Sequence, residues 1–307
     1  MIFGKLVFLR TRIGILRLAF EVGGPGIRKE EKGIPIVTIY RGAFTAGEEI
    51  AKSVARSLGY RCVSREVLIE ASRRCGISEA KLNEVLEKDP HWWERWLQNM
   101  RPYRVALQTA MCEVAQGGNI VYHGHIGHEL LPGIRHVLKV MLTAPLEFRI
   151  KQVQSQQGLD EAKARRYIDH VDEARTRRLL TLFGTDWRDI TRYDLALNVA
   201  QVGIEGATRV IVEAARLERY QPTAASEQDF QNLTLASRVQ AALVMSPAIR
   251  SLGITVQAEK GEVHVSGICT YSVPEEEIVS LVKSIPGVTR VVTDFTVIPA
   301  DMGEGYY

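Results

Sequence analysis

Short apolar runs alternate with stretches of helical periodicity over residues 34–215. Runs rich in β-branched and aliphatic side chains predict buried strands at residues 34–40, 119–122, 137–142 and 194–199. Between these runs apolar residues recur every three or four positions, which predicts helices at residues 50–58, 102–115, 146–156 and 160–183. Strands that alternate with helices in this way predict an α/β domain over residues 34–216 with a doubly wound parallel sheet.

The pattern changes after residue 216. Periodicity is lost over residues 217–232, where small and polar side chains accumulate, and we interpret this stretch as an interdomain linker. A helix at residues 235–245 then precedes a predicted hairpin, a further helix and a last strand at residues 288–298. We therefore expect a second, small α+β domain over residues 233–300, followed by a tail at residues 301–307.

Residues 1–33 have a different character. Apolar residues are mixed with basic ones, so the stretch has neither the length of apolar sequence that a membrane span needs nor the uninterrupted core of a secretory signal. We expect a loosely ordered extension here. A basic amphipathic segment that touches a membrane surface or a partner is the alternative.

Composition narrows the class of protein. Of the 307 residues 46% are hydrophobic and 24% charged, which excludes a disordered or fibrous chain. The net charge of +3 is close to balance, so we expect no nucleic-acid partner. We expect no transmembrane span, because the apolar start of the chain is interrupted by basic residues. The four cysteines show no C-x-x-C pair, which predicts reduced, mostly buried thiols in a cytoplasmic protein.

The turn after the first predicted strand has the glycine spacing of a phosphate-binding P-loop, from Gly42 to Gly47. Glu48 and Glu49 then stand where that motif has Lys and Ser or Thr, and carboxylates at a helix start repel a polyphosphate. Thr45 and Glu48 also have the spacing of a capping box, which would satisfy the first amides of the helix from within the protein. The residues alone leave a phosphate site and a plain capped helix both open.

Residues 37–68, together with the segments 124–132, 144–150, 172–175, 186–189 and 193–198, resemble the cytidylate kinase-like family of P-loop nucleoside monophosphate kinases. The resemblance implies a P-loop kinase-like fold with a helical lid, and the use of ATP and Mg²⁺. It implies that the nucleotide is bound by residues of the loop and the helix start, namely Arg41, Gly42, Thr45, Ala46, Gly47 and Glu49. Phe44 and Ala46 stand where similar proteins have glycine, and a Cβ there hinders the approach of backbone to phosphate.

The same resemblance implies three catalytic residues in the lid, Asp172, Arg175 and Arg178, which would neutralise charge on the transferred phosphoryl group. An ion pair between Asp172 and Arg175 on a solvated helix face is the alternative. The resemblance also implies three residues on the acceptor side, Arg65, His125 and Asp194. His125 replaces an arginine of the family's motif, which removes bidentate recognition of phosphate.

Three histidines follow the second predicted strand as His123, His125 and His128. Imidazoles at this spacing could ligate a transition metal, but no further close ligand completes a site. We expect polar histidines in a strand-to-helix turn and no bound metal.

The C-terminal segment resembles a BON domain, on the apolar spacing of residues 235–243 and on the glycines Gly261, Gly267 and Gly287. This resemblance implies a regulatory or localising module with a phospholipid or envelope partner, and so peripheral contact with a membrane. Two functions stay open: a cytidylate kinase-like enzyme that phosphorylates CMP or a similar acceptor, and a catalytically impaired nucleotide sensor or scaffold that signals through the BON-like domain.

Overall fold

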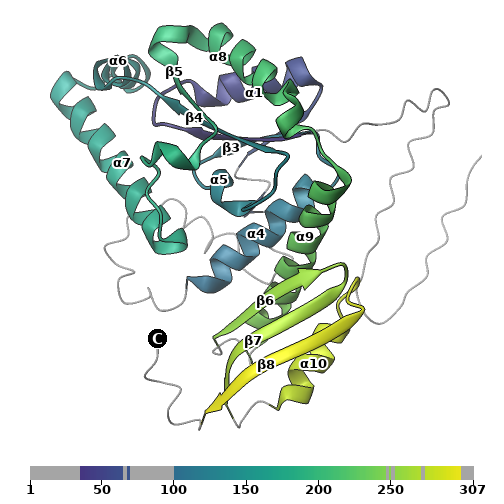
Figure 1. The fold of residues 1–307 in the computed structure, drawn as a ribbon. Helices are drawn as coiled ribbons and strands as arrows, with labels where there is room; N and C mark the ends of the chain where they lie inside the picture. The colour runs from purple at the N-terminus through teal and green to yellow at the C-terminus, as the bar shows by residue number, and fades with distance from the viewer. Residues whose placement is uncertain are drawn as a thin grey trace, which may run out of the picture. The chain divides into compact units, whose positions relative to one another are not determined.

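A computed structural model of the chain describes residues 35–64, 68–69, 100–246, 249, 253–270 and 274–298. The expectations for residues 1–33, Arg65 and residues 301–307 lie outside these ranges. Within the ranges, the chain forms a sheet with helices on both faces and a second, smaller sheet (Figure 1).

The first sheet has five parallel strands in the order β2-β3-β1-β4-β5. They are β1 Ile36–Arg41, β2 Arg61–Val63, β3 Ile120–Gly124, β4 Val137–Thr143 and β5 Leu195–Asn198. Four of them correspond to the predicted apolar runs, whereas β2 is too short and too exposed to give such a run. The doubly wound parallel sheet is therefore confirmed.

Helices cover both faces of this sheet because its inner strands β1, β3 and β4 are buried over most of their length on both sides. On one face α1 (Gly47–Leu58) and α8 (Val199–Arg216) pack on the strands, with Ile50 and Ile211 fully buried. On the other face α4 (Arg101–Ala115) and the short α5 (Gly127–Leu130) bury Leu107 and Leu130. The two apolar clusters hold the carboxyl ends of the strands in fixed positions.

Two further helices, α6 (Leu146–Gln157) and α7 (Glu161–Phe183), pack on each other beside the carboxyl end of β4 (Figure 1). Their contact is a small apolar cluster that includes Ile150 and Ile168. Asp160 begins α7 by accepting a hydrogen bond from the backbone N–H of Lys163 at 2.8 Å. This pair occupies the position in the sequence where the helical lid was predicted.

Helix α9 (Ala224–Met245) begins inside the stretch predicted as a linker. Thr223 and Ser226 cap its first turn reciprocally, which a sequence rich in small polar residues conceals because the same residues are typical of loops. Phe230 from this first half joins the core beneath the parallel sheet, and Ser226 Oγ lies 2.9 Å from His136 Nδ1. Residues 224–232 thus pack with the first domain.

The second half of α9 packs on the second sheet, which has the order β6-β7-β8. Its elements are β6 Ile254–Glu259, β7 Glu262–Thr270, α10 Glu275–Lys283 and β8 Arg290–Ile298. Strands β6 and β7 form the predicted hairpin, and β8 adds to β7 in parallel. Val239 of α9 and Ile278 of α10 are buried against Val263 and Val265. The small α+β domain is confirmed.

The described helices include none long and apolar enough to cross a bilayer. Three of the cysteines fall within the described ranges and all three are free. Cys112 and Cys269 are buried as expected, whereas Cys62 of β2 is exposed.

Candidate active site

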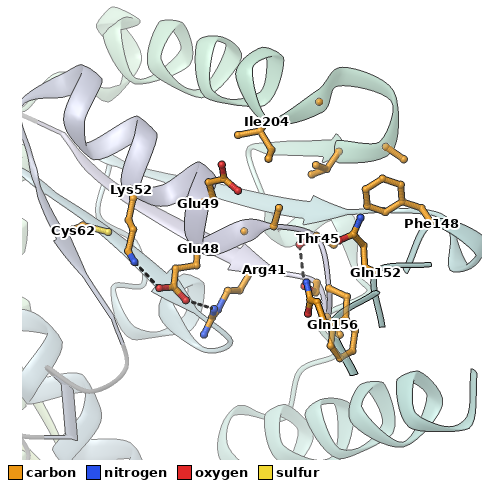
Figure 2. A pocket seen from close by; sticks show the side chains of 18 of the residues that line it. Arg41, Thr45, Glu48, Glu49, Lys52, Cys62, Phe148, Gln152, Gln156 and Ile204 are labelled. Carbon is orange, nitrogen blue, oxygen red and sulfur yellow. Dashed lines mark hydrogen bonds and ion pairs between the residues drawn. The ribbon is translucent and has the colours of Figure 1, made fainter. Parts of the chain in front are cut away.

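A cavity of about 1150 Å³ opens where β1 and β5 end (Figure 2). Its floor is the loop from Arg41 to Gly47, and its walls come from α1, α6, α8 and Arg175 of α7. A ligand cleft in an open α/β sheet is expected at the carboxyl ends of the parallel strands, and this cavity has that position.

The loop is held by its own backbone. The N–H of Gly42 donates to the carbonyl of Leu142 at 2.9 Å, and Thr45 Oγ1 donates to the carbonyl of Gly42 at 2.9 Å. A Cβ on Gly47 would lie 2.4 Å from the Cβ of Arg41, so only glycine allows the first turn of α1 to pass so close to β1.

Two residues of the loop adopt the left-handed conformation without being glycine. Phe44 has φ 60° and Ala46 has φ 54°. Each costs roughly 1–2 kcal/mol relative to glycine. The loop therefore keeps a glycine-type path in spite of its sequence, and the Cβ atoms of Phe44 and Ala46 do not prevent it.

The capping box predicted from Thr45 and Glu48 is not formed. Ala46 is the N-cap of α1, no side chain caps the helix, and the Thr45 hydroxyl is used within the loop. The alternative of a helix capped by Thr45 is therefore wrong, because the Thr45 hydroxyl donates to the carbonyl of Gly42 instead. The first amides of α1 thus lack a side-chain cap beside the cavity, which is the arrangement that binds phosphate in other loops of this shape.

Glu48 lies at the position of the P-loop lysine, and its side chain points toward Lys52 and Arg41 (Figure 2). Its carboxylate accepts a hydrogen bond from Lys52 at 2.7 Å and lies 3.4 Å from a guanidinium nitrogen of Arg41. The hydrogen bond from Lys52 lowers the pKa of Glu48, so its charge is retained at neutral pH. Two cations that line the cavity are therefore bound to a carboxylate of the protein.

The lid helices reach the loop through Arg149 of α6. Arg149 donates from Nε to the carbonyl of Ala43 at 3.0 Å and from a terminal nitrogen to Asp172 at 2.7 Å. Phe44 adds an apolar contact, because its ring lies 5.6 Å from that of Tyr167 and packs on the cluster between α6 and α7. The alternative of an ion pair between Asp172 and Arg175 on a solvated helix face is therefore not what the structure shows, because Asp172 pairs with Arg149, which in turn holds the loop.

Arg175 extends from α7 toward the end of β1. It donates to the carbonyl of Arg41 at 3.2 Å and lines the cavity. Burial lowers the pKa of its guanidinium from the ordinary value, although an arginine stays charged at neutral pH. Among the described residues no carboxylate forms an ion pair with it. A partly buried cation with a neutral partner beside a cavity is suited to an anionic ligand.

The remaining predicted site residues have other positions. Arg178 is buried and does not line the cavity. His125 follows β3 and lies with its ring 5.9 Å from that of Tyr40. Asp194 lies before β5, at the opposite end of the sheet from the cavity, where its carboxylate accepts a hydrogen bond from the backbone N–H of Lys139 at 2.8 Å. The structure thus gives Asp194 a role in joining β4 to β5.

Sequence reasoning missed an aromatic cluster behind the loop. The Tyr40 ring stacks on Trp187 at 5.3 Å and meets the edges of His128 and Tyr193. Burial raises the pKa of the Tyr40 phenol. A tyrosine at the end of a buried strand looks like ordinary core in a sequence. Across the described ranges, no group of three histidine, cysteine or acidic side chains is placed to hold a metal.

The two left-handed residues allow a matched test of the loop. We expect Ala46→Gly to stabilise the protein by about 0.5–1 kcal/mol, because glycine adopts this conformation without strain. We expect Phe44→Gly to destabilise it by about 1–2 kcal/mol, because the gain in backbone energy is smaller than the loss of apolar packing against the lid helices. Urea unfolding of both variants measures the difference, and equal stabilisation would show that Phe44 does not hold the lid.

His128 makes stability depend on pH. Burial lowers its pKa to about 4 from an ordinary value of 6.5, so between these values the unfolded chain binds a proton that the folded chain does not. Stability is therefore lost as the pH falls through this window. Between pH 7 and pH 4.5 we expect the wild type to lose about 2 kcal/mol more than His128→Gln. Urea unfolding at both pH values, with the exposed His264→Gln as control, measures this, and parallel losses in all three proteins would contradict it.

Comparison with known proteins agrees with this geometry. Residues 36–201 match the model of the cytidylate kinase-like family, and residues 231–299 match that of the BON domain. A cytidylate kinase of Ignicoccus hospitalis is 32% identical over 163 residues, which cover 53% of this chain and 88% of the relative. A cytidylate kinase of Methanopyrus kandleri is 32% identical over 185 residues, covering 56% of this chain and 90% of the relative.

The match to the family model spans more than half of the 307 residues, and the loop, lid and parallel sheet lie within it. The chain therefore belongs to the cytidylate kinase-like family and carries a BON domain after its kinase-like domain.

Proposed function

We propose that this protein transfers the γ-phosphoryl group of ATP to a nucleoside monophosphate, with CMP as the preferred acceptor. One observation carries the proposal. The start of α1, which has no side-chain cap, lies beside the same cavity as Arg175, which has no carboxylate partner in the described structure. The first turn of α1 and Arg175 line one cavity of about 1150 Å³, which has room for a nucleotide. The family's named relatives support the acceptor, since they are cytidylate kinases.

Phosphoryl transfer of this kind depends on positioning and on charge neutralisation. The backbone of the loop from Gly42 to Gly47 would hold the phosphates, and Arg175 would neutralise the charge that develops on the transferred group. Arg149 would hold the lid over the loop, because it already connects Ala43 to Asp172. Arg41 has a second role in this scheme, since its carbonyl positions Arg175.

The chain has a residue suited to Mg²⁺ at the expected place. Glu49 occupies the position of the P-loop Ser or Thr, lines the cavity, and forms no hydrogen bond or ion pair through its carboxylate within the described ranges. A carboxylate is a ligand that Mg²⁺ accepts. When bound, the ion would supply positive charge that offsets the charge of the phosphates, and Glu49 would hold it.

A second candidate function rests on Glu48. A carboxylate that binds Arg41 and Lys52 weakens the attraction of the loop for phosphate, which favours a sensor that binds nucleotide weakly and signals through the BON domain. In either function we propose that the BON domain regulates or localises the protein, with a phospholipid or envelope component as its partner.

One experiment separates the two functions. Purified full-length protein is incubated with ATP, Mg²⁺ and each of CMP, dCMP, UMP and AMP, and ADP formation is followed by a coupled assay. We expect turnover with CMP above the others. Nucleotide binding in a thermal-shift assay without turnover would support the sensor, and neither binding nor turnover would refute both.

A further inference from the structure

A second cavity, of about 530 Å³, lies apart from the nucleotide cavity and shares no lining residue with it. It is bounded by α5, by the start of β4, and by the 3₁₀ turns at Ile190–Arg192 and Glu218–Tyr220. All of these segments belong to the kinase-like half of the chain. Asp194, which was predicted to bind the acceptor, lines this cavity.

Cations outnumber carboxylates in the lining. Four basic residues face two acidic ones, and the basic set is Arg135, Lys139, Arg192 and Arg219. Glu129 is paired with Arg192, which donates a hydrogen bond to each of the two carboxylate oxygens, at 2.7 and 2.6 Å. The other carboxylate, of Asp194, accepts from the backbone of Lys139. The surplus of positive charge is therefore not neutralised by the lining itself.

Arg135 and Arg219, which have no carboxylate partner in the lining, are held in place by backbone carbonyl groups. Arg135 donates to the carbonyls of Gln221 and Glu218, at 3.1 and 3.4 Å, and Arg219 donates to the carbonyl of Arg135 at 3.0 Å. These bonds fix the guanidinium groups without cancelling their charge. A planar guanidinium held in this way is suited to a phosphate or carboxylate group.

Lys139 completes the arrangement. Its ammonium group forms no hydrogen bond or ion pair within the part of the chain that the structure describes, although it stands on a central strand of the sheet and lines the cavity. Arg192 binds both oxygens of the Glu129 carboxylate, and the Asp194 carboxylate accepts from the backbone N–H of Lys139 rather than from its ammonium group. An uncompensated ammonium beside two fixed guanidinium groups attracts an anion with several charged oxygens.

We propose that this cavity binds a small phosphorylated anion, at a site distinct from the nucleotide site. The cavity has the volume of a small-molecule site, and its lining is charged and polar rather than apolar, which favours a phosphorylated metabolite over an apolar ligand. Arg135 and Arg219 hold the phosphoryl oxygens, and Lys139 supplies the remaining charge.

Titration of the full chain with inorganic pyrophosphate, followed by calorimetry, tests the site. We expect Lys139→Met to weaken binding at least tenfold and Lys139→Arg to retain it, because the arginine restores the charge. Lys151→Met is the matched control, since Lys151 is an exposed lysine of α6 that lines neither cavity. Its affinity should equal that of the wild type.

Binding at the nucleotide cavity is separated by a second variant. Arg175→Ala should leave the component that depends on Lys139 unchanged. The proposal is overturned if Lys139→Met binds pyrophosphate as tightly as Lys151→Met does, or if Arg175→Ala alone removes all binding. Circular dichroism shows whether Lys139→Met and Lys139→Arg are folded. If Lys139→Met is unfolded, the affinity of Lys139→Arg for pyrophosphate decides the case.

Discussion

Replacing Arg175 by alanine should reduce phosphoryl transfer by roughly 10²–10³-fold while leaving the protein folded. The guanidinium lines the cavity proposed to bind nucleotide and donates a hydrogen bond to the carbonyl of Arg41. Because no carboxylate within the described ranges pairs with it, its removal leaves no buried charge without a partner. The loss should therefore fall on kcat, where charge on the transferred group is greatest, and less on the affinity for nucleotide.

Steady-state kinetics with ATP and CMP measures this effect. Arg166→Ala is the control, because Arg166 is an exposed arginine of the same helix and does not line the cavity. Arg175→Lys should recover only part of the rate, since an ammonium lacks the fork of the guanidinium. Full activity in Arg175→Ala would remove Arg175 from the proposed catalytic set and leave Arg178 as the remaining lid arginine of the prediction.

Reversing the charge of Glu48 should strengthen nucleotide binding, in contrast to most substitutions in a binding loop. Glu48 binds Lys52 and Arg41, and its own negative charge lies at the helix start where phosphate would bind. Glu48→Gln releases both cations, and Glu48→Arg in addition supplies a cation where P-loops have lysine. We expect ATP to bind about tenfold tighter to Glu48→Gln, and tighter still to Glu48→Arg.

Calorimetric titration with ATP, with and without Mg²⁺, measures the gain in affinity. Glu147→Gln is the control, because it removes one negative charge from an exposed helix start that does not line the cavity. The gain should shrink at high salt, because the groups involved are exposed. Weaker binding in Glu48→Gln, seen only when Mg²⁺ is present, would instead make Glu48 a ligand of the ion.

The sequence predicts the parallel sheet well because its strands are buried on both sides and so appear as continuous apolar runs. The exposed strand β2 gives no such signal. The fold of the loop could be predicted from its glycine spacing, but the conformation of Phe44 and Ala46 could not, since propensity opposes it. Only contacts with the lid helices, which are distant in sequence, explain how Phe44 is held there.

The sequence singled out residues for which the family resemblance implies direct contact with a ligand, and it gave less indication of residues that act by holding another residue. Arg175 was identified by resemblance, whereas Arg149 was not, because its role depends on the carbonyl of Ala43 and on Asp172. Asp194 shows the opposite case. Its position in a characteristic segment suggested binding, yet its carboxylate joins two strands.

Helix α9 has a practical consequence for dividing this protein. Phe230 and Ser226 serve the kinase-like core, while Val239 and Leu243 serve the BON domain, so one continuous helix supplies side chains to both. A truncation at residues 217–232 would remove part of the core of the kinase-like domain, and a cut later in the helix would remove part of the core of the BON domain. We therefore expect that neither domain keeps a complete core when it is produced without the other. Recombination that joins this kinase-like domain to another BON domain would meet the same requirement. The exchanged segment would have to include helix α9.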